Sequence, residues 1–220
     1  FDLESVNFLN NLKVKYFKIP SGEITNIPLL KKIGKLKKKI IISSGMSNLK
    51  EIKIALKILI SMGTKKKDLT VLHCNTEYPA TISKLNLFSI QFLKEKLRLK
   101  VGYSDHSIGF EASIMALALG ASTLEKHFTL DKNLKGPDHK SSLSPKELKK
   151  YVDTLRKFEK SLGIYNKLPY FEELKNIDKI RKQIVAKQYI KKGTIFSETN
   201  LTTKRAKKGI PASHWNKVLG

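Results

Sequence analysis

Short runs of apolar, mostly β-branched residues alternate with longer amphipathic stretches from the start of the chain to about Leu162. Each run ends in polar residues or glycine, and each longer stretch repeats its apolar positions with the period of a helix. Strands that alternate with helices of this length predict βαβ units and a parallel sheet. The predicted strands are Val14–Ile19, Lys39–Ser43, Leu69–Cys74, Leu99–Tyr103 and Ser122–Lys126, and the predicted helices are Ile27–Ile33, Asn48–Met62, Leu85–Leu97, Phe110–Leu119 and Pro145–Leu162.

The last of these helices has a clear start signal. Ser144 suits the N-cap position, Pro145 suits the first turn, and Glu147 stands where its side chain can join that turn.

Five βα units do not close an eight-stranded barrel, so an open, doubly wound sheet is the structural alternative. The positions of polar side chains favour the barrel, because they fall at the carboxyl ends of all five strands. A TIM barrel builds its site from that rim, whereas an open sheet binds its ligand at one switch point. We therefore predict an α/β fold, a partial TIM (β/α) barrel with strands missing upstream. The polar groups are Lys18, Ser43, His73–Tyr78, Ser104 to His106 and Glu125 to His127.

The pattern changes after Leu162. A stretch rich in Lys, Asn and Glu predicts a linker that can hold one short helix, and a strand at Gln183–Ile190, a turn and Ile195–Leu201 predict a small mixed or β unit. The predicted domains are a barrel domain of residues 1–162, a linker of residues 163–179 and a small domain of residues 180–220. The first residue is not Met and the small unit stops without an evident end, so we expect a chain truncated at both ends.

The 220 residues carry a formal net charge of +24, which raises the question of a nucleic-acid partner. The excess is almost all Lys and is spread along the chain, while Arg, which makes bidentate base contacts, is scarce. No basic run is interleaved with the aromatic residues that stack on single strands. We therefore expect solvated Lys on outer helix faces, with some attraction for anionic substrates and no nucleic-acid partner.

Other global features indicate an ordinary globular protein. No apolar run approaches the roughly 18 residues that a membrane helix needs, and the start lacks a secretory signal pattern. A single cysteine, Cys74, excludes an internal disulfide framework. We expect a cytoplasmic protein without a membrane partner.

Two histidines close adjacent predicted strands, His106 and His127. Imidazoles from neighbouring strand ends can meet over a barrel mouth and hold a divalent metal, with substrate oxygens and water in the other positions. Such a site suits Mn²⁺, Co²⁺ or Mg²⁺ better than a closed zinc site. The alternative is a pair of structural histidines that cap strands through hydrogen bonds.

Other residues of the mouth suit a compact anion. Lys18 with the hydroxyls of Ser21, Ser43 and Ser104 can bind a phosphate-bearing acid. Asp138, in a Gly-Pro turn after the His127 strand, can bond a polyhydroxy substrate or simply form an Asx turn. Structural roles are favoured for three further residues, Cys74, His73 and His139.

Six motifs in this order resemble the N-acetylneuraminate (sialic acid) synthase family, which includes legionaminic acid and spore-coat sugar synthases. The resemblance covers nearly the whole chain, and the tail around Lys191–Arg205 is similar to the start of an antifreeze-like (SAF) domain. The motifs are Phe17 to Glu23 (FKIPSGE), Ile42 to Met46 (ISSGM), His73 to Pro79 (HCNTEYP), Gly102 to Ser107 (GYSDHS), Leu124 to Thr129 (LEKHFT) and Gly136 to His139 (GPDH).

The resemblance implies a role for each matching residue. His106 and His127 would be metal ligands, with Mn²⁺ the expected cofactor and Mg²⁺ or Co²⁺ possible. Arg205 would reach the partner subunit's site in a domain-swapped homodimer, although Ala206-Lys207 replaces the family's usual Pro-Gly after it. Lys18, Glu23 and Asp138 would be catalytic. Phosphoenolpyruvate would contact Lys18, Ser21, Ser43, Thr76 and Ser104, and the amino sugar would contact Glu23, Tyr78 and Asp138.

The implied reaction is the condensation of phosphoenolpyruvate with an open-chain N-acyl amino sugar, of the N-acetylmannosamine type, to a nonulosonic acid and phosphate. The family's first three barrel strands, with a catalytic Glu, are absent from this sequence. Two alternatives remain open: another phosphoenolpyruvate-dependent aldol-type synthase, with a pseudaminic or sugar-phosphate product, and a basic binding module. The sequence does not distinguish among N-acyl amino sugars.

Overall fold

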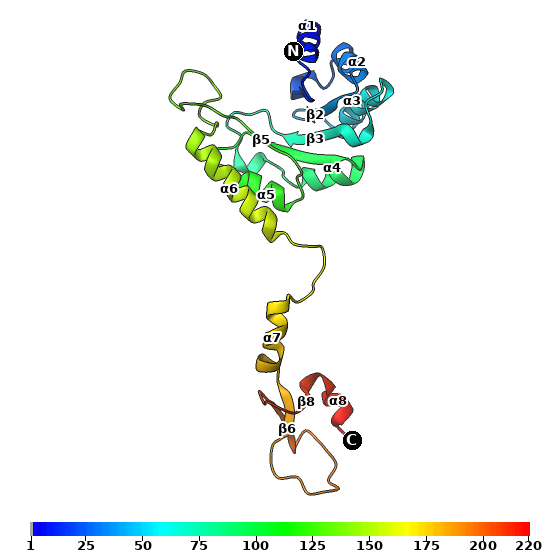
Figure 1. The fold of residues 1–220 in the computed structure, drawn as a ribbon, viewed down its shortest axis with the longest axis vertical. Coiled ribbons are helices and arrows are strands. Elements are labelled where there is room, and N and C mark those ends of the chain that lie inside the picture. Colours follow the sequence, from blue (N-terminus) through cyan, green and yellow to red (C-terminus); the bar gives the residue numbers. More distant parts are fainter. Residues whose placement is uncertain (1) are drawn as a thin grey trace. The chain divides into compact units, whose positions relative to one another are not determined.

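The computed structural model describes residues 2–220, which form two compact units. The first unit ends at Gly163 and the second runs from Ile164 to Gly220. Figure 1 shows the helices and strands of each unit. None of the helices within residues 2–220 combines the length and the apolar composition that crossing a bilayer requires.

The first unit contains five parallel strands, which lie side by side in the order in which they occur along the chain. A helix follows each strand, which confirms the predicted βα repeat and the α/β fold (Figure 1). The strands are β1 Tyr16–Ile19, β2 Lys39–Ser43, β3 Leu69–Cys74, β4 Lys100–Asp105 and β5 Leu124–Lys126, and the helices are α1 Leu3–Asn11, α2 Ile27–Lys35, α3 Leu49–Ser61, α4 Ser89–Leu97, α5 Glu111–Ala118 and α6 Pro145–Ser161.

The strand register assigns side chains to the two faces of the sheet. Cys74 pairs with Ser104, and Ser104 pairs with Glu125, so these three side chains share one face, which we call the inner face. One residue further along, Asp105 pairs with Lys126, and their side chains point to the opposite, outer face. The pair Ser104–Glu125 therefore faces the inner side of the sheet, and the next pair, Asp105–Lys126, faces the outer side.

The outer face packs against the helices and forms the hydrophobic core. Ile42 of β2 and Val71 of β3 are fully buried there, together with Leu30 of α2 and Leu59 of α3. Burying one such side chain contributes roughly 1.5–3 kcal/mol relative to leaving it in water. The apolar outer face thus holds the sheet and leaves the inner face free for polar groups.

The sheet is curled towards its inner face. β1 and β5 are its two edge strands, yet Lys18 Nζ of β1 lies 3.3 Å from Glu125 Oε1 of β5. A flat sheet of this width would hold two edge residues much further apart, since neighbouring strands are about 4.8 Å apart. The ion pair therefore shows the curvature of a barrel wall, which confirms the predicted partial TIM barrel.

The close approach of β4 and β5 depends on Gly102. A Cβ atom at this position would lie 2.2 Å from the carbonyl oxygen of Thr123 and 2.6 Å from Leu72 Cδ2. The backbone N–H of Tyr103 donates to that same carbonyl at 2.9 Å. Only glycine fits here without moving β5 away from β4.

Helix starts in this unit follow their capping residues. At α6 the Ser144 Oγ accepts from the backbone N–H of Glu147, and the Glu147 carboxylate accepts from the Ser144 backbone N–H at 2.8 Å, which confirms the predicted start. The hydrogen bond from Lys132, followed by that from the Ser144 backbone, lowers the pKa of Glu147 to about 2. Asn48 and Glu51 form the same capping box at α3.

Several elements differ from the prediction, two of them for reasons visible in the local structure. α4 begins at Ser89 rather than Leu85, because Asn86 adopts a positive φ of 47° that no helix accommodates. β4 continues past Tyr103 to Asp105, since its pairing with β5 extends to Lys126. α1, which begins after the N-cap Asp2, was not predicted.

The second unit holds a small antiparallel sheet in the order β7-β6-β8, preceded by helix α7. α7 lies mostly within the predicted linker, and β6 is shorter than the predicted strand Gln183–Ile190. The elements are α7 Phe171–Ile180, β6 Gln183–Ala186, β7 Leu201–Lys204, β8 Ile210–Pro211 and α8 Trp215–Val218.

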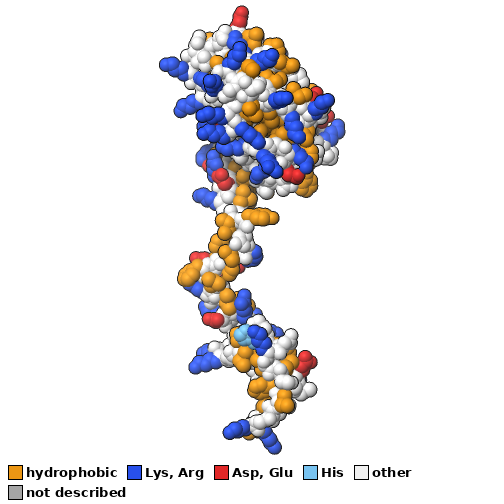
Figure 2. Space-filling model, turned by 90° about the vertical axis from the view of Figure 1, so that its right-hand side faces the viewer, with side chains coloured by type: hydrophobic (Ala, Val, Ile, Leu, Met, Phe, Trp, Pro, Cys, Tyr) orange, Lys and Arg blue, Asp and Glu red, His pale blue; other side chains and the backbone are white. Residues whose placement is uncertain are grey.

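Lys and Arg side chains are distributed over the visible face of the first unit, with apolar side chains between them (Figure 2). The face shown has no single basic stripe of the kind that follows a nucleic-acid backbone.

Candidate active site

The candidate site lies on the inner face, at the carboxyl ends of the five strands. Lys18 comes from β1, Ser43 from β2, Ser104 from β4 and Glu125 from β5. Their register places them on one face of a curled sheet, so the strand ends converge on one region. Four of the five strands thus contribute a polar side chain to the same place.

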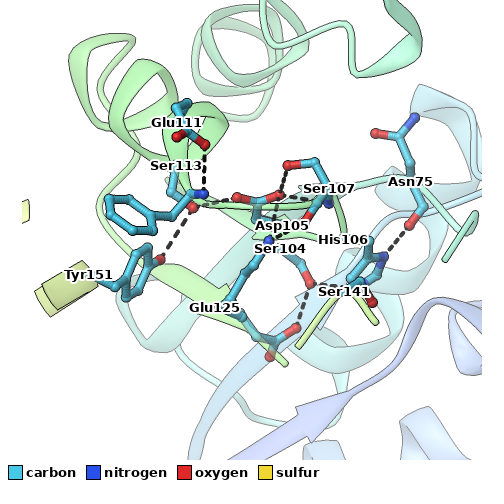
Figure 3. Close-up of polar contacts among 12 residues, drawn as sticks. Asn75, Ser104, Asp105, His106, Ser107, Glu111, Ser113, Glu125, Ser141 and Tyr151 are labelled. Atoms are coloured by element: carbon cyan, nitrogen blue, oxygen red, sulfur yellow. Dashed lines mark hydrogen bonds and ion pairs between the residues drawn. The ribbon is translucent and has the colours of Figure 1, made fainter. Parts of the chain in front are cut away.

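A chain of contacts joins three of these side chains to the first histidine. Glu125 Oε1 lies 3.3 Å from Lys18 Nζ and accepts a hydrogen bond of 2.7 Å from Ser104 Oγ. Ser104 Oγ also lies 3.2 Å from His106 Nε2 (Figure 3). A cation, a carboxylate, a hydroxyl and an imidazole are therefore continuous across the mouth.

His106 and His127 face each other directly after β4 and β5. Their ring centroids are 5.1 Å apart and the rings are nearly perpendicular, at 85°. The Tyr78 ring stacks on His106 at 4.1 Å and meets His127 edge-on at 5.2 Å. The structure therefore brings together the two predicted metal ligands and the predicted sugar-contacting tyrosine.

The hydrogen bonds around His106 indicate its tautomer. His106 Nδ1 lies 2.5 Å from the carbonyl oxygen of Asn75, which can only accept, so Nδ1 carries the proton. The single Ser104 hydroxyl proton is directed to Glu125, which leaves the lone pair of His106 Nε2 without a dedicated donor. Burial lowers the pKa of the His106 imidazole more than the hydrogen bond to Asn75 raises it. A neutral imidazole with a free lone pair is the form that binds metals.

His127 completes a donor pair. Its Nδ1 lies 3.7 Å from Asp138 Oδ2, which is close but longer than a hydrogen bond. Within residues 2–220 no group of three His, Cys, Asp or Glu side chains is arranged to hold a metal ion. Two imidazoles with open positions for oxygen ligands fit a divalent cation such as Mn²⁺, and the residues present therefore suit the predicted cofactor.

The predicted anion-binding hydroxyls lie beside this cluster. Ser43 Oγ is buried and has no hydrogen-bond partner among the described residues. Ser21 Oγ accepts from the Gly45 backbone N–H at 3.0 Å and lies 3.1 Å from Cys74 Sγ. A buried hydroxyl without a partner is costly unless a ligand supplies one, which makes Ser43 the more available donor for an anion.

Four other predicted site residues are less closely tied to the cluster. Glu23 follows β1 and accepts from Asn26 Nδ2 at 2.6 Å; no hydrogen bond or ion pair of the described residues joins Glu23 to the histidines. Thr76 is exposed in the segment after β3, and Asp138 is exposed beside His127. Arg205 lies in the second unit, exposed and directly after β7.

Glu125 and Asn75 lie in the polar stretches that the sequence places at the strand ends, but the sequence assigned neither of them a role in the site. Glu125 makes contacts with Lys18 and Ser104, and the Asn75 backbone fixes His106. Alternation within β5 would have found Glu125, because it stands two positions before His127 on the same face. No sequence signal marks a backbone carbonyl such as that of Asn75.

A second ion pair lies behind the site, on the outer face. Lys126 Nζ is 3.3 Å from Asp105 Oδ1, and the side chains are 1% and 0% exposed. Burial lowers the pKa of Lys126, against the opposing effect of Asp105. His73 is also on this face, where its Nε2 lies 2.7 Å from the Leu85 carbonyl oxygen and burial lowers its pKa.

The fold and site together define a class: (β/α) barrels that gather a lysine, serines and two histidines at the carboxyl ends of their strands. More specifically, the chain belongs to the NeuB family, whose model matches residues 1–167, and a SAF domain matches residues 181–220. The predicted resemblance to sialic acid synthases and the predicted SAF domain are thereby confirmed.

Named relatives carry synthase activities. The chain is 56% identical over 220 residues to N,N'-diacetyllegionaminic acid synthase of Campylobacter jejuni, covering 100% of this chain and 66% of that protein. It is 37% identical over 221 residues to human N-acetylneuraminate-9-phosphate synthase, covering 100% and 61%. The crystal structure of N-acetylneuraminic acid synthetase from Leptospira borgpetersenii, in complex with citrate, matches with a TM-score of 0.76 at 36% identity, covering 81% and 61%.

The chain therefore spans 66% of the length of the first relative and 61% of the second. The shared part includes the candidate site and the SAF domain, since the alignments cover this chain completely.

Proposed function

We propose that this chain is part of a synthase that joins phosphoenolpyruvate to an open-chain N-acyl amino sugar and releases a nonulosonic acid and phosphate. The observation that carries the proposal is the inner-face cluster, in which Lys18 lies beside Glu125 and Ser104, next to the facing pair His106 and His127. An anion site adjoining a pair of histidines suits a reaction between an anionic enol and an aldehyde.

Lys18 and the serines would hold the phosphoenolpyruvate. Lys18 Nζ is only partly exposed and is paired with a carboxylate that an incoming phosphate can replace. The unpartnered Ser43 hydroxyl and the Ser104 hydroxyl would donate to the same anion. Held in this way, C3 of phosphoenolpyruvate would face the aldehyde carbon, an orientation effect of roughly 7–11 kcal/mol at best.

The bond changes balance with water as the only other reactant. C3 of phosphoenolpyruvate forms a bond to the aldehyde carbon, water adds at C2, and the resulting tetrahedral intermediate expels phosphate. Glu125, which contacts both Lys18 and Ser104, is placed to hold the proton that the water gives up. A divalent cation held by His106 and His127 would supply polarisation of the aldehyde oxygen.

The preferred sugar is proposed from the relative at 56% identity, which is named for an N,N'-diacetyl product. Phosphoenolpyruvate contains no nitrogen, so both acetamido groups of such a product must come from the sugar. We therefore propose a diacetamido sugar as substrate in preference to N-acetylmannosamine. Asp138 and Tyr78, beside His127 and His106, would contact its polar groups.

The test is a direct assay of the intact protein that contains this chain. Phosphoenolpyruvate, Mn²⁺ and either a diacetamido hexose or N-acetylmannosamine are supplied, and phosphate release and product mass are followed. Sugar-dependent phosphate release and a product three carbons longer than the sugar are expected, with the diacetamido sugar giving the higher kcat/KM. Absence of product with every N-acyl amino sugar would contradict the proposal.

The proposal extends to a homodimer in which Arg205 of one subunit acts at the site of the other. Arg205 is exposed at the end of β7, and its guanidinium could bond the acyl oxygen of the sugar. Arg205→Ala subunits are mixed with His127→Ala subunits, each nearly inactive alone. Action between subunits restores part of the activity, because a mixed dimer has one site with both groups intact. If heterodimers form and activity stays absent, Arg205 does not act in the partner's site.

A further inference from the structure

We propose that Asp105 and Lys126 are a positioning pair that fixes the separation of His106 and His127 for the divalent cation. The inference rests on the proposed function. It starts from the strand register: Asp105 and Lys126 are direct partners across β4 and β5, and each immediately precedes one of the histidines. The pair lies on the outer face and the histidine side chains lie on the inner face. The pair would therefore position the histidines by fixing the backbone of β4 and β5.

Asp105 is held by more contacts than a simple ion pair needs. Its Oδ1 accepts from the backbone N–H of Ser107 at 2.9 Å and from Ser107 Oγ at 2.6 Å, and its Oδ2 accepts from Ser113 Oγ of α5 at 2.7 Å. Tyr151 of α6 donates in turn to Ser113 Oγ at 3.3 Å (Figure 3). The carboxylate therefore ties the end of β4 to two helices.

Lys126 and Asp105 together hold Ser107, the residue after His106; we call these three residues the clamp. The Lys126 ammonium donates to the carbonyl oxygen of Ser107 as well as contacting Asp105. Ser107 is thus held at its N–H by Asp105 and at its C=O by Lys126, immediately after His106. The carbonyl of His106 accepts from the Ala80 N–H at 2.9 Å, so the backbone around this ligand is fixed on both sides.

The energetics of burial favour a geometric role. Two charges that are 0% and 1% exposed lose their hydration, and well-packed apolar residues of similar volume often replace such a pair without loss of stability. What apolar residues cannot replace is the set of directed bonds to Ser107. Metal affinity depends on ligand placement, and removal of groups that orient ligands typically lowers it about 10–100-fold.

The test is Mn²⁺ binding by the intact protein, measured without substrate by electron paramagnetic resonance or calorimetry. In the double variant Asp105→Leu/Lys126→Met both charges are replaced, so that no unpaired ion is left in the core. We expect a folded protein with a lower melting temperature, because the buried donors of Ser107 and Ser113 lose their acceptor. We also expect a Mn²⁺ dissociation constant at least about tenfold higher. Unchanged Mn²⁺ affinity in the folded double variant would overturn the inference.

A matched control removes a pair of the same chemistry elsewhere. Lys149 and Asp153 form an ion pair of 2.8 Å on the exposed side of α6. Lys149→Met/Asp153→Leu should leave Mn²⁺ affinity unchanged, and an equal loss in this control would also overturn the inference, because the effect would not be specific to the clamp.

A milder variant covers the case in which the double variant does not fold. Ser113→Ala removes the hydrogen bond to Asp105 Oδ2 and leaves both charges in place. A several-fold weaker Mn²⁺ affinity with unchanged fold supports the inference, and unchanged affinity overturns it. If the wild-type protein makes product and binds Mn²⁺, and the variants bind Mn²⁺ with the same affinity, only the positioning role is refuted. Wild-type protein that binds no Mn²⁺ refutes the proposed metal site and the inference together.

Discussion

Two Lys–carboxylate pairs lie on opposite faces of the same sheet, and their nitrogen–oxygen distances are equal at 3.3 Å. The inner pair, Lys18–Glu125, has side chains that are 34% and 37% exposed, whereas those of the outer pair, Lys126–Asp105, are 1% and 0% exposed. Distance alone therefore does not define what an ion pair does. Because the inner pair is partly exposed, a ligand can replace Glu125 as the partner of Lys18. The outer pair is buried, so separating its charges would leave them without partners in the core.

The largest expected effect tests whether the inner face is the reactive one. Replacing His106 or His127 by Ala in the intact protein should reduce metal-dependent turnover by about a thousand-fold or more, since a cation contributes several kcal/mol to such a reaction. Steady-state phosphate release measures the effect, and circular dichroism checks that the fold is retained. Full activity in the double variant His106→Ala/His127→Ala would refute the metal site.

The second prediction compares the two pairs directly through stability. Asp105→Ala leaves the Lys126 ammonium buried without its partner and should lower the free energy of unfolding by about 3–5 kcal/mol. Glu125→Gln on the inner face should change it by about 1 kcal/mol or less. Urea denaturation of both variants provides the measurement. Equal losses would mean that the two environments do not differ in the way described.

A smaller effect is expected on substrate affinity. Lys18→Met should raise the KM for phosphoenolpyruvate about ten- to a hundred-fold, the magnitude of one hydrogen bond to a charged group, and should change the KM for the sugar far less. Initial rates at varied concentrations of each substrate separate the two constants. A larger rise in the sugar KM would place Lys18 in the other half of the site.

The smallest effect concerns pH and the outer face. Burial lowers the folded-state pKa of His73 below the unfolded value of 6.5, so folding excludes the proton that the unfolded chain accepts. The His73 contribution is absent above pH 6.5 and turns destabilising as pH falls below it, levelling off under the folded pKa. Stability of the wild type should fall more steeply below pH 6.5 than that of His73→Gln. Identical pH profiles would contradict this account.

The sequence predicted the sheet well because its signals are local. Each strand is an apolar, β-branched run, and the βα order alone restricts the topology to a parallel sheet. The prediction of element boundaries fails where a single residue sets the backbone conformation. Asn86 is an example, because its positive φ makes α4 begin only at Ser89. α7 agrees with the one short helix that the linker could hold, but the stretch around it, rich in Lys, Asn and Glu, does not define the bounds of that helix.

The site was predicted in its residue types but not in its connections. Lys18, His106 and His127 follow from their positions at strand ends, and Tyr78 from the family resemblance; the structure places them near each other or in one chain of contacts. The contact of Lys18 with Glu125 requires the curvature of the sheet, which no local pattern encodes. The chemical roles of all these residues, and those of Glu23, Thr76, Asp138 and Arg205, remain predictions.

Gly102 would make the proposed metal site sensitive to a substitution outside the site. Because a methyl group there would collide with Thr123, β5 could stay against β4 only by sliding or tilting, and His127 would travel with it while His106 remained. A substitution at Gly102, which contacts neither histidine nor substrate, would thereby change the separation of His106 and His127. The absence of a side chain at Gly102 would thus help to set the geometry of the proposed cation site.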